Sequence, residues 1–349
     1  EPTDMGDGNG NCSPDHMCGP SMWKDIVPTG ATVNECGGSE QTPIDLRESI
    51  VTGDINTKPT YVRYNDGCHH WTSFVDDHAL EVNFAKDGHD CPNYKMMIGG
   101  KTYNFIQLHF HAPSEHTMDG HDIAAEVHLV HVSDAGELAV VGVFLEKDDQ
   151  CESNPMLEMI WESTHDTINK KKLTNDPMKI ADRVYCEVEV ESEEEMNPYE
   201  YVPETEDFYR YHGSLTTYPC SEGVLWTVYR QPVRISSFDL TVLQETVKFH
   251  SETIISKSGS DARPVEPVGS RDILYYEDPS ALVSMKGGKG GKKGKCGPKG
   301  KGGKGKKGGK GGKDDKKSKG GKDDKKGGKK VKVKKGGKKG KEEEEEEEE

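Results

Sequence analysis

Three histidines with strand-like spacing are the residues of this 349-residue chain best placed to do chemistry. His109 and His111 belong to the run Gln-Leu-His-Phe-His at 107–111, where alternate side chains of a strand project from one face about 7 Å apart. His128 lies in a separate apolar run, with Glu126 as its neighbour on the same face. Three imidazoles from adjacent strands can bind one zinc ion and leave a fourth position open for water, as catalytic zinc sites do.

Two further side chains are spaced to support such a centre. Ligating imidazoles need partners on their second ring nitrogen to fix tautomer and orientation, and Gln107 and Glu126 are suitably placed to provide them. Neutral ligands leave the ion's full double charge to lower the pKa of a bound water to about 7. On spacing alone, three ordinary core or surface histidines explain the pattern better, so the surrounding residues have to decide.

Short strands separated by turn residues are predicted to hold these side chains in place. Alternation and compact β-branched runs predict strands over residues 103–111, 123–132, 138–145 and 223–229. Helical spacing is rarer, and it predicts one helix over residues 156–168 and another that begins at Ser236 or Ser237. The acidic stretch 187–207 is interpreted as a solvated loop that could still attract divalent cations. A mostly β fold with a large sheet and peripheral helices follows.

Composition divides the chain into an acidic body and a basic tail. Residues 286–349 hold 26 of the 46 basic residues, all of them lysines, together with 21 glycines and 12 acidic residues. The first 285 residues therefore keep 20 basic and 50 acidic residues, a net charge of −30, which disfavours binding to nucleic-acid phosphates. The tail lacks the apolar surface needed to offset ordering entropy, so it is predicted to be disordered. No apolar run reaches the roughly 18 residues of a membrane span.

The cysteines indicate an oxidising compartment. Nine scattered cysteines form no Cys-X-X-Cys pair, which suits a secreted protein better than a cytosolic one with free thiols. The chain begins at Glu1, as a mature product would after signal cleavage, and Asn11 stands in an Asn-Cys-Ser glycosylation sequon. An odd number leaves at least one thiol unpaired or intermolecular, and Cys296 in the tail is the expected one.

The wider sequence around the histidines resembles the zinc-site pattern of the α-carbonic anhydrases. The matching segments are residues 107–111, 114–117 and 124–131, then 41–45, 138–142, 213–217 with Trp226, and Arg263-Pro264 with Pro267 and Arg271. The resemblance covers roughly residues 19–276. It implies the α-carbonic anhydrase fold, a large, strongly twisted, mainly antiparallel sheet with zinc at the base of a conical cavity. Residues 1–18 are then a flexible arm, 277–285 a linker and 286–349 the tail.

The resemblance also implies a role for each matching residue in the zinc-dependent interconversion of carbon dioxide and bicarbonate. His109, His111 and His128 would hold zinc. Thr216 would accept a hydrogen bond from zinc-bound hydroxide and pass its own proton to Glu115. The substrate would lie beside Thr217 and an apolar wall formed by Val130, Val140, Leu215 and Trp226.

Proton export is predicted to depend on His78, which matches the family's shuttle position. Histidines suit this task because they titrate near neutrality, and His69 and His70 are weaker alternatives. The acidic residues Asp76, Glu81 and Asp261 stand where relatives often carry amides. They should make the cavity mouth more anionic.

The remaining expectations concern covalent and tail interactions. Cys36 and Cys220 match the disulfide of secreted family members, whereas the sequence does not indicate the pairing of Cys12, Cys18, Cys68, Cys91, Cys151 and Cys186.

A secreted enzyme with a low-complexity tail resembles the nacrein-like carbonic anhydrases of mollusc shells. The tail is predicted to bind calcium, calcium carbonate or acidic matrix polymers. Two alternatives for the tail are that it folds back on the acidic body and shields the active-site mouth, or that it is a solubilising spacer with no specific partner. The alternative is a matrix or mineral-binding scaffold with weak or no catalytic activity.

Overall fold

The structure is a computed structural model that describes residues 20–26, 33–62, 68–75, 80–83, 94–154, 157–158, 186–203, 207–253, 262–278, 296 and 332–334. The strands are β1 Asp45–Leu46, β2 Gly53–Asp54, β3 Thr60–Val62, β4 Cys68–Val75, β5 Leu80–Asn83, β6 Lys95–Ile98, β7 Lys101–His111, β8 Thr117–Met118, β9 His121–Asp122, β10 Ala125–Ser133, β11 Leu138–Lys147, β12 Cys186–Met196, β13 Phe208–Ser214, β14 Glu222–Ile235, β15 Leu274–Tyr276 and β16 Lys332–Lys334. The helices are α3 Ser237–Thr253 and three short 3-10 helices, Pro20–Asp25, Glu48–Ile50 and Pro198–Tyr201.

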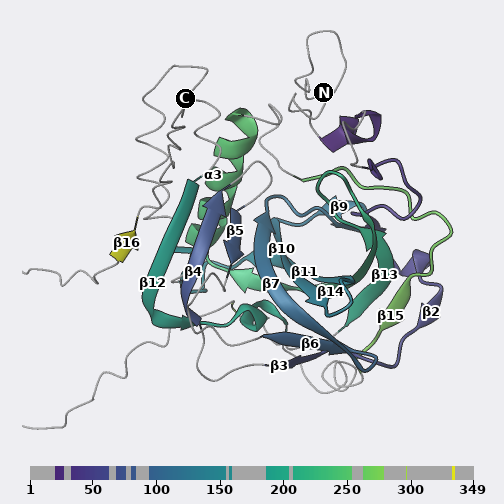
Figure 1. The fold of residues 1–349 in the computed structure, drawn as a ribbon, viewed down its shortest axis with the longest axis horizontal. Helices are drawn as coiled ribbons and strands as arrows, with labels where there is room; N and C mark the ends of the chain where they lie inside the picture. Colours follow the sequence, from purple (N-terminus) through teal and green to yellow (C-terminus); the bar gives the residue numbers. More distant parts are fainter. Residues whose placement is uncertain are drawn as a thin grey trace, which may run out of the picture.

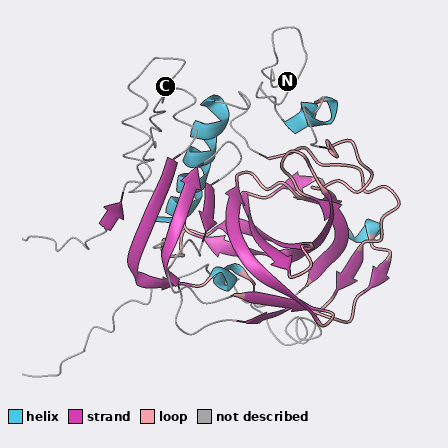
Figure 2. Ribbon diagram, viewed as in Figure 1, coloured by secondary structure: helices cyan, strands magenta, loops and turns pink. Residues whose placement is uncertain are grey.

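One large curved sheet dominates the described residues. Its strands run in the order β16-β12-β4-β5-β7-β10-β11-β14-β13-β15-β2, and off this path β6 pairs with β7 and β3 pairs with β6. Most neighbours are antiparallel, although β11 pairs with β14 in parallel. Strands β7, β10, β11, β14 and β13 curve around a common centre (Figures 1 and 2). A separate 3-stranded sheet has the order β1-β8-β9. The predicted mostly β fold with few helices is confirmed, and so are the four predicted strands.

The two faces of the sheet carry different apolar clusters because successive side chains of a strand point to opposite faces. On β10, Val127 and Leu129 belong to a large core cluster that also includes Leu240 and Leu243 of α3. Val130, two residues beyond His128, belongs instead to a second cluster with Val140 and Trp226. The candidate histidines therefore share a face with the smaller cluster, while the larger one supports the sheet from behind.

The helix predicted at Ser236 or Ser237 is α3, and Ser236 is its N-cap. The Asp239 amide donates to Ser236 Oγ at 3.0 Å, and the Ser236 amide donates to Asp239 Oδ2 at 3.3 Å. This reciprocal pair satisfies two of the amide groups that a helix N-terminus leaves without partners. Figure 2 shows α3 as the principal helix beside the sheet. Among the described residues, no helix is long and apolar enough to cross a membrane.

The interpretation of residues 187–207 as a solvated loop is wrong. This stretch contains β12, which pairs with β4, and then a 3-10 helix whose Tyr199 and Tyr201 are fully buried. Valine alternates with glutamate through Val188 and Val190, and this period of two is a strand pattern that the high charge obscured. The tyrosines then bury large apolar surfaces in the main core cluster.

The expectation that Cys296 stays unpaired is also wrong, because Cys296 forms a disulfide with Cys151. Within the described part of the tail, Lys332–Lys334 forms β16 and pairs antiparallel with β12, with Lys334 opposite Glu189. The other residues of the tail lie outside the described residues, as does most of the helix predicted over 156–168.

Candidate active site

Strands β7 and β10 bring the three candidate histidines together. In the antiparallel register His109 lies directly opposite His128, and His111 lies opposite Glu126. His109 and His111 are two positions apart on β7, so both face the same side as His128. Their ligand nitrogens all lie within 4.8 Å of one another, close enough to hold one metal ion.

The oxygen atoms beside two of the rings direct the lone pairs of the rings toward one another. His109 Nδ1 lies 2.9 Å from Gln107 Oε1, and His128 Nε2 lies 3.0 Å from Glu126 Oε1. Oxygen acceptors require protons on both of these nitrogens, so the opposite nitrogens of the neutral rings present lone pairs. Those nitrogens, His109 Nε2 and His128 Nδ1, are 3.2 Å apart. Two facing lone pairs at this distance repel unless a cation lies between them, so this donor set fits a zinc ion.

Glu126 is the fully buried acceptor around which the site is organised. It accepts from the backbone amides of Glu115 and His116 at 3.1 and 2.9 Å, and its Oε1 lies 2.8 Å from His116 Nδ1. Burial alone would raise the pKa of Glu126, but the charges and hydrogen bonds of His116 and His128 lower it well below its ordinary value. Gly142 on β11 leaves the necessary room, since a Cβ there would lie 2.7 Å from Glu126 Oε1.

A second buried carboxylate, Glu115, lies next to the histidine cluster. Its Oε1 accepts from the Arg263 backbone amide at 3.0 Å, and its Oε2 lies 3.4 Å from His111 Nε2 and 3.8 Å from His128 Nδ1. Glu115 makes no hydrogen bond with Thr216 among the described residues. The sequence had indicated Glu115 but not the backbone amide that holds it, because a distant loop supplies that donor.

A cavity of about 270 Å³ opens onto the three histidines. Its other lining residues are the polar Glu81, Gln107, Thr216 and Thr217 and the apolar Val130, Val140, Leu215 and Trp226. Every side chain expected beside the substrate therefore lines this one cavity. The lining combines apolar side chains with hydrogen-bonding groups, so a small, weakly polar molecule could lie next to a bound metal.

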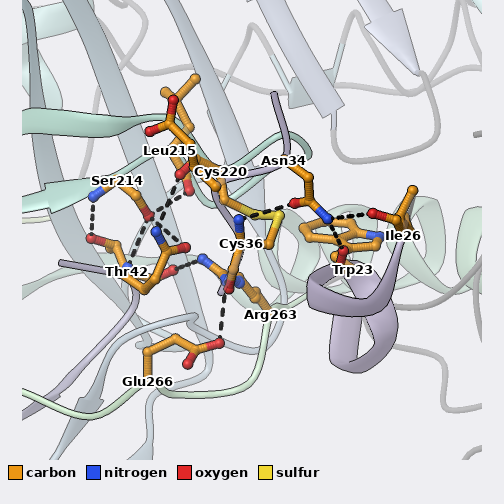
Figure 3. Close-up of a disulfide and its surroundings, with 12 residues drawn as sticks. Trp23, Ile26, Asn34, Cys36, Thr42, Ser214, Leu215, Cys220, Arg263 and Glu266 are labelled. Atoms are coloured by element: carbon orange, nitrogen blue, oxygen red, sulfur yellow. Dashed lines mark hydrogen bonds and ion pairs between the residues drawn. A yellow bond between two sulfur atoms is a disulfide. The ribbon is translucent and has the colours of Figure 1, made fainter. Parts of the chain in front are cut away.

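The Cys36–Cys220 disulfide holds the loop that carries Thr216 and Thr217. Its S–S distance is 2.02 Å, and Figure 3 shows it beside Trp23 and Arg263. The Arg263 guanidinium donates to the Thr42 and Cys36 carbonyls at 2.6 and 3.2 Å. In turn the Thr42 amide donates to Ser214 Oγ at 3.0 Å, just before Leu215 (Figure 3). The pairing implied by the resemblance is present, and the segment around Thr42 supports the cavity wall that includes Leu215, Thr216 and Thr217.

Two residues that support the site have no clear signal in the sequence, and some predicted site residues lie outside the described part of the chain. His116 and Tyr211 were given no role, yet the Tyr211 hydroxyl lies 2.6 Å from His116 Nε2 and so supports the ring that contacts Glu126. The only signal for His116 was its place in the motif at 114–117. His78, Asp76 and Asp261 lie outside the described residues, and for His69 and His70 only the backbone of β4 is described.

The site combines three histidines that could hold one metal ion with a partly apolar cavity, on a curved, mainly antiparallel sheet. The chain belongs to the eukaryotic-type carbonic anhydrase family, whose family model matches residues 18–277. Alpha carbonic anhydrase 3 of Arabidopsis thaliana is 30% identical over 272 residues, which cover 77% of this chain and 84% of that relative. The predicted family is thus confirmed, and with it the enzyme class.

Solved structures and a differently named relative match as well. Carbonic anhydrase Cah3 from Chlamydomonas reinhardtii, solved in complex with acetazolamide, is 28% identical with a TM-score of 0.55, covering 74% of this chain and 97% of that one. A dioscorin solved in complex with ascorbate is 25% identical with a TM-score of 0.54, covering 75% and 95%. This chain is therefore also similar in fold to a protein that carries a different name.

Proposed function

We propose that this protein catalyses the reversible hydration of carbon dioxide to bicarbonate with a zinc ion held by His109, His111 and His128. The observation that carries the proposal is the convergence of three imidazole nitrogens within 4.8 Å beside the cavity. When bound, zinc supplies the Lewis acidity that lowers the pKa of water to about 7, so that hydration can proceed at neutral pH. The protein's own residues bind the ion, orient the reactants and move protons.

Glu115 and Thr216 are proposed to orient the attacking water. One Glu115 oxygen is occupied by the Arg263 amide, while Oε2 is buried and accepts no hydrogen bond among the described residues. This oxygen is available to accept from the Thr216 hydroxyl, which would direct the threonine oxygen's lone pairs toward the water. Thr216 is itself buried at the cavity wall, so bulk water does not compete for this bond.

The apolar wall is proposed to hold carbon dioxide, with Thr217 at its edge. Carbon dioxide carries no net charge, so side chains such as Val130, Val140 and Trp226 can accommodate it without desolvating an ion. Bicarbonate, in contrast, loses hydration in such a pocket and is displaced readily. This difference favours release of the charged product.

His78 is proposed to carry the proton away from the site. The proposal rests on its motif and on the titration range of imidazole. His78→Ala should lower kcat in dilute buffer on the order of 10²-fold, at the lower end of general acid–base effects, and change kcat/KM little. Stopped-flow hydration with and without added imidazole measures both constants. An equal loss in kcat and kcat/KM would assign His78 another role.

The experiment that tests the function itself is stopped-flow carbon dioxide hydration combined with metal analysis of the purified full-length chain. About one zinc per chain and hydration inhibited by acetazolamide, the ligand solved with the Chlamydomonas relative, are the expected results. A protein that binds zinc but does not hydrate carbon dioxide would support the scaffold function instead. Absence of zinc from protein that was refolded with the metal would contradict the ligand assignment.

An extracellular location is proposed from the covalent structure. The Cys36–Cys220 and Cys151–Cys296 disulfides persist more readily outside the reducing cytosol. Mass spectrometry of the alkylated, unreduced protein from its source would detect both linkages. Free thiols at all four positions would contradict this location.

The basic tail is proposed to tether the enzyme to an anionic surface, either acidic matrix polymers or calcium carbonate, as in a biomineralising matrix of the nacrein-like type. In support, part of the tail already lies along acidic β12, where Lys332 and Lys334 stand opposite Glu191 and Glu189. The glutamate run at 342–349 can in addition bind calcium through carboxylate oxygens.

The tether is tested by adsorption to calcium carbonate and to a sulfated polysaccharide. Truncation after Ser284 removes Cys296, so the truncated chain should carry Cys151→Ser and be compared with full-length Cys151→Ser/Cys296→Ser protein. Salt-sensitive adsorption by the full-length form alone is expected, because exposed charges are screened within about 10 Å at 0.1 M salt. Equal adsorption by both forms would remove the tail from this role.

A further inference from the structure

We propose that Glu81 is a positioning residue that selects the metal-binding tautomer of His109 by fixing the orientation of the Gln107 amide. The inference rests on the proposed zinc site, because it concerns one of the three zinc ligands. Glu81 lies on β5, next to β7 in the sheet and opposite His109 in the register. It also lines the cavity.

Both oxygens of Glu81 are held by amide donors. Oε2 accepts from Gln107 Nε2 at 3.0 Å, and Oε1 accepts from Asn83 Nδ2 at 2.7 Å. Asn83 is two residues along β5 and lies opposite Gln107 in the register. Hydrogen bonds to a carboxylate are roughly twice as strong as those between neutral groups, so the side chain has a defined orientation.

The orientation of Gln107 matters because an amide has a donating end and an accepting end of nearly the same shape. A carboxylate can only accept, so Glu81 draws the Gln107 NH₂ group toward itself. The Gln107 Oε1 atom then faces His109 Nδ1 at 2.9 Å. An oxygen at this position requires a proton on Nδ1, which leaves the lone pair on His109 Nε2, the nitrogen directed at His128.

With the amide reversed, its NH₂ group would face His109 and favour the opposite tautomer. The proton would then stand on Nε2, where it blocks metal binding. His128 does not have this ambiguity, because its Nε2 faces the carboxylate of Glu126 directly. His128 is thus oriented directly by the carboxylate of Glu126. His109 is oriented by the Gln107 amide, which in turn is oriented by the carboxylate of Glu81.

The test compares Glu81→Ala and Glu81→Gln with the wild type, and Glu146→Gln is the matched control. Glu146 is an exposed glutamate near the end of β11, so its substitution removes the same charge away from the cavity. Imidazole ¹⁵N NMR of the zinc-free protein, at a pH where histidines are neutral, reports the tautomer of His109. Transfer of zinc to a chelator reports the dissociation rate of the metal independently of catalysis.

In the wild type and in Glu146→Gln we expect the Nδ1–H tautomer of His109. Glu81→Ala should give a mixture of tautomers and release zinc about 10-fold faster, the lower end of effects for groups behind a ligand. Glu81→Gln should be intermediate, since its amide can present either end to Gln107. If the alanine variant does not fold, this isosteric variant decides the question.

An unchanged His109 tautomer in the Glu81 variants, or zinc release at the wild-type rate, would overturn the inference while leaving the proposed zinc site intact. If the wild type itself bound no zinc, the proposed function would fail. The tautomer comparison would still decide the role of Glu81 because it is made without metal.

Discussion

The two faces of β10 carry two buried histidines whose surroundings differ in charge. His128 faces the cavity, where Glu126 lies 3.0 Å from one ring nitrogen and Glu115 lies 3.8 Å from the other. His131, three residues further on, faces the main core. There its Nδ1 donates to the Leu129 carbonyl at 3.0 Å, and its Nε2 lies 3.0 Å from the Tyr199 hydroxyl. One ring has anionic partners and the other has neutral ones.

Because of this difference, the surroundings of His128 can stabilise a positive charge, whereas those of His131 cannot. Burial lowers the pKa of His131 to about 4, because its backbone hydrogen bonds raise the pKa less than burial lowers it. Burial also lowers the pKa of His128, but Glu126 acts in the opposite direction through its charge and hydrogen bond. Carboxylates therefore make the cavity face suitable for a cation, while the core face keeps a neutral ring as a packing element.

The largest expected effect is loss of the metal when the cavity histidine is removed. His128→Ala should weaken zinc binding on the order of 100-fold or more, because four-ligand sites bind zinc with about 10–16 kcal/mol, or about 3 kcal/mol per ligand. His131→Gln is the control on the opposite face of the same strand and should retain zinc. Metal analysis after dialysis against a chelator distinguishes them. Equal zinc retention by both variants would show that the cavity face of β10 does not bind the metal in preference to the core face.

The core histidine should instead determine part of the pH dependence of stability. Its pKa is about 4 when folded and about 6.5 when unfolded, so above pH 6.5 both states are neutral and no difference arises. As the pH falls toward 4, the unfolded state binds a proton that the folded state does not. The free energy of unfolding should then decrease by about 3 kcal/mol.

This second prediction is measured as the difference between the wild type and His131→Gln in urea unfolding from pH 7 to pH 4. Subtracting the two curves cancels the contributions of carboxylates and other histidines. The variant should be less stable than the wild type at pH 7 and should lose less stability on acidification. Parallel curves would show that His131 is protonated within the folded protein.

A third, smaller effect is expected for the carboxylate that distinguishes the faces. Glu126→Gln keeps the shape, but its NH₂ group must face one of the donors that the carboxylate now accepts, such as His116 or His128. Zinc affinity should fall about 10- to 100-fold. Competition with a chelator measures this, and Glu137→Gln on the exposed surface is the control. An unchanged affinity would mean that the ring of His128 is oriented without Glu126.

The histidine cluster on the cavity face could be predicted from the sequence, because the period of two places His109 and His111 on one face of any strand that contains them. It did not predict that Glu126 also binds His116 and two backbone amides. These donors come from a loop whose position beside β10 is set by tertiary packing and cannot be derived from local spacing. The acidic segment at 187–207 misled for the opposite reason. Its glutamates obscured a strand, and the burial of Tyr199 against His131 depends on contacts between residues 68 positions apart.

Two tyrosines offer the finest test, because each lies within hydrogen-bonding distance of one histidine Nε2 but on opposite faces. Tyr199 lies 3.0 Å from His131, and Tyr211 lies 2.6 Å from His116, which in turn contacts Glu126. Replacing either by phenylalanine removes one buried hydroxyl without opening a large cavity. Tyr199→Phe should lower the free energy of unfolding by about 1 kcal/mol, the usual net contribution of one hydrogen bond. Tyr211→Phe should lower it by about 2 kcal/mol, because the Tyr211 hydroxyl also donates to Thr42 Oγ1 at 3.3 Å.

The two substitutions should differ in their effect on the metal site. Tyr211→Phe loosens the His116 ring that fixes Glu126, so zinc should be released a few-fold faster, roughly two- to fivefold, less than for substitution of a group in direct contact with a ligand. Tyr199→Phe affects a neutral ring on the core face and should leave zinc release unchanged. Urea unfolding combined with chelator transfer gives both quantities for each variant. If Tyr199→Phe accelerated zinc release as much as Tyr211→Phe, the faces of β10 would be mechanically coupled, and the separation between a cation-binding face and a packing face would not hold.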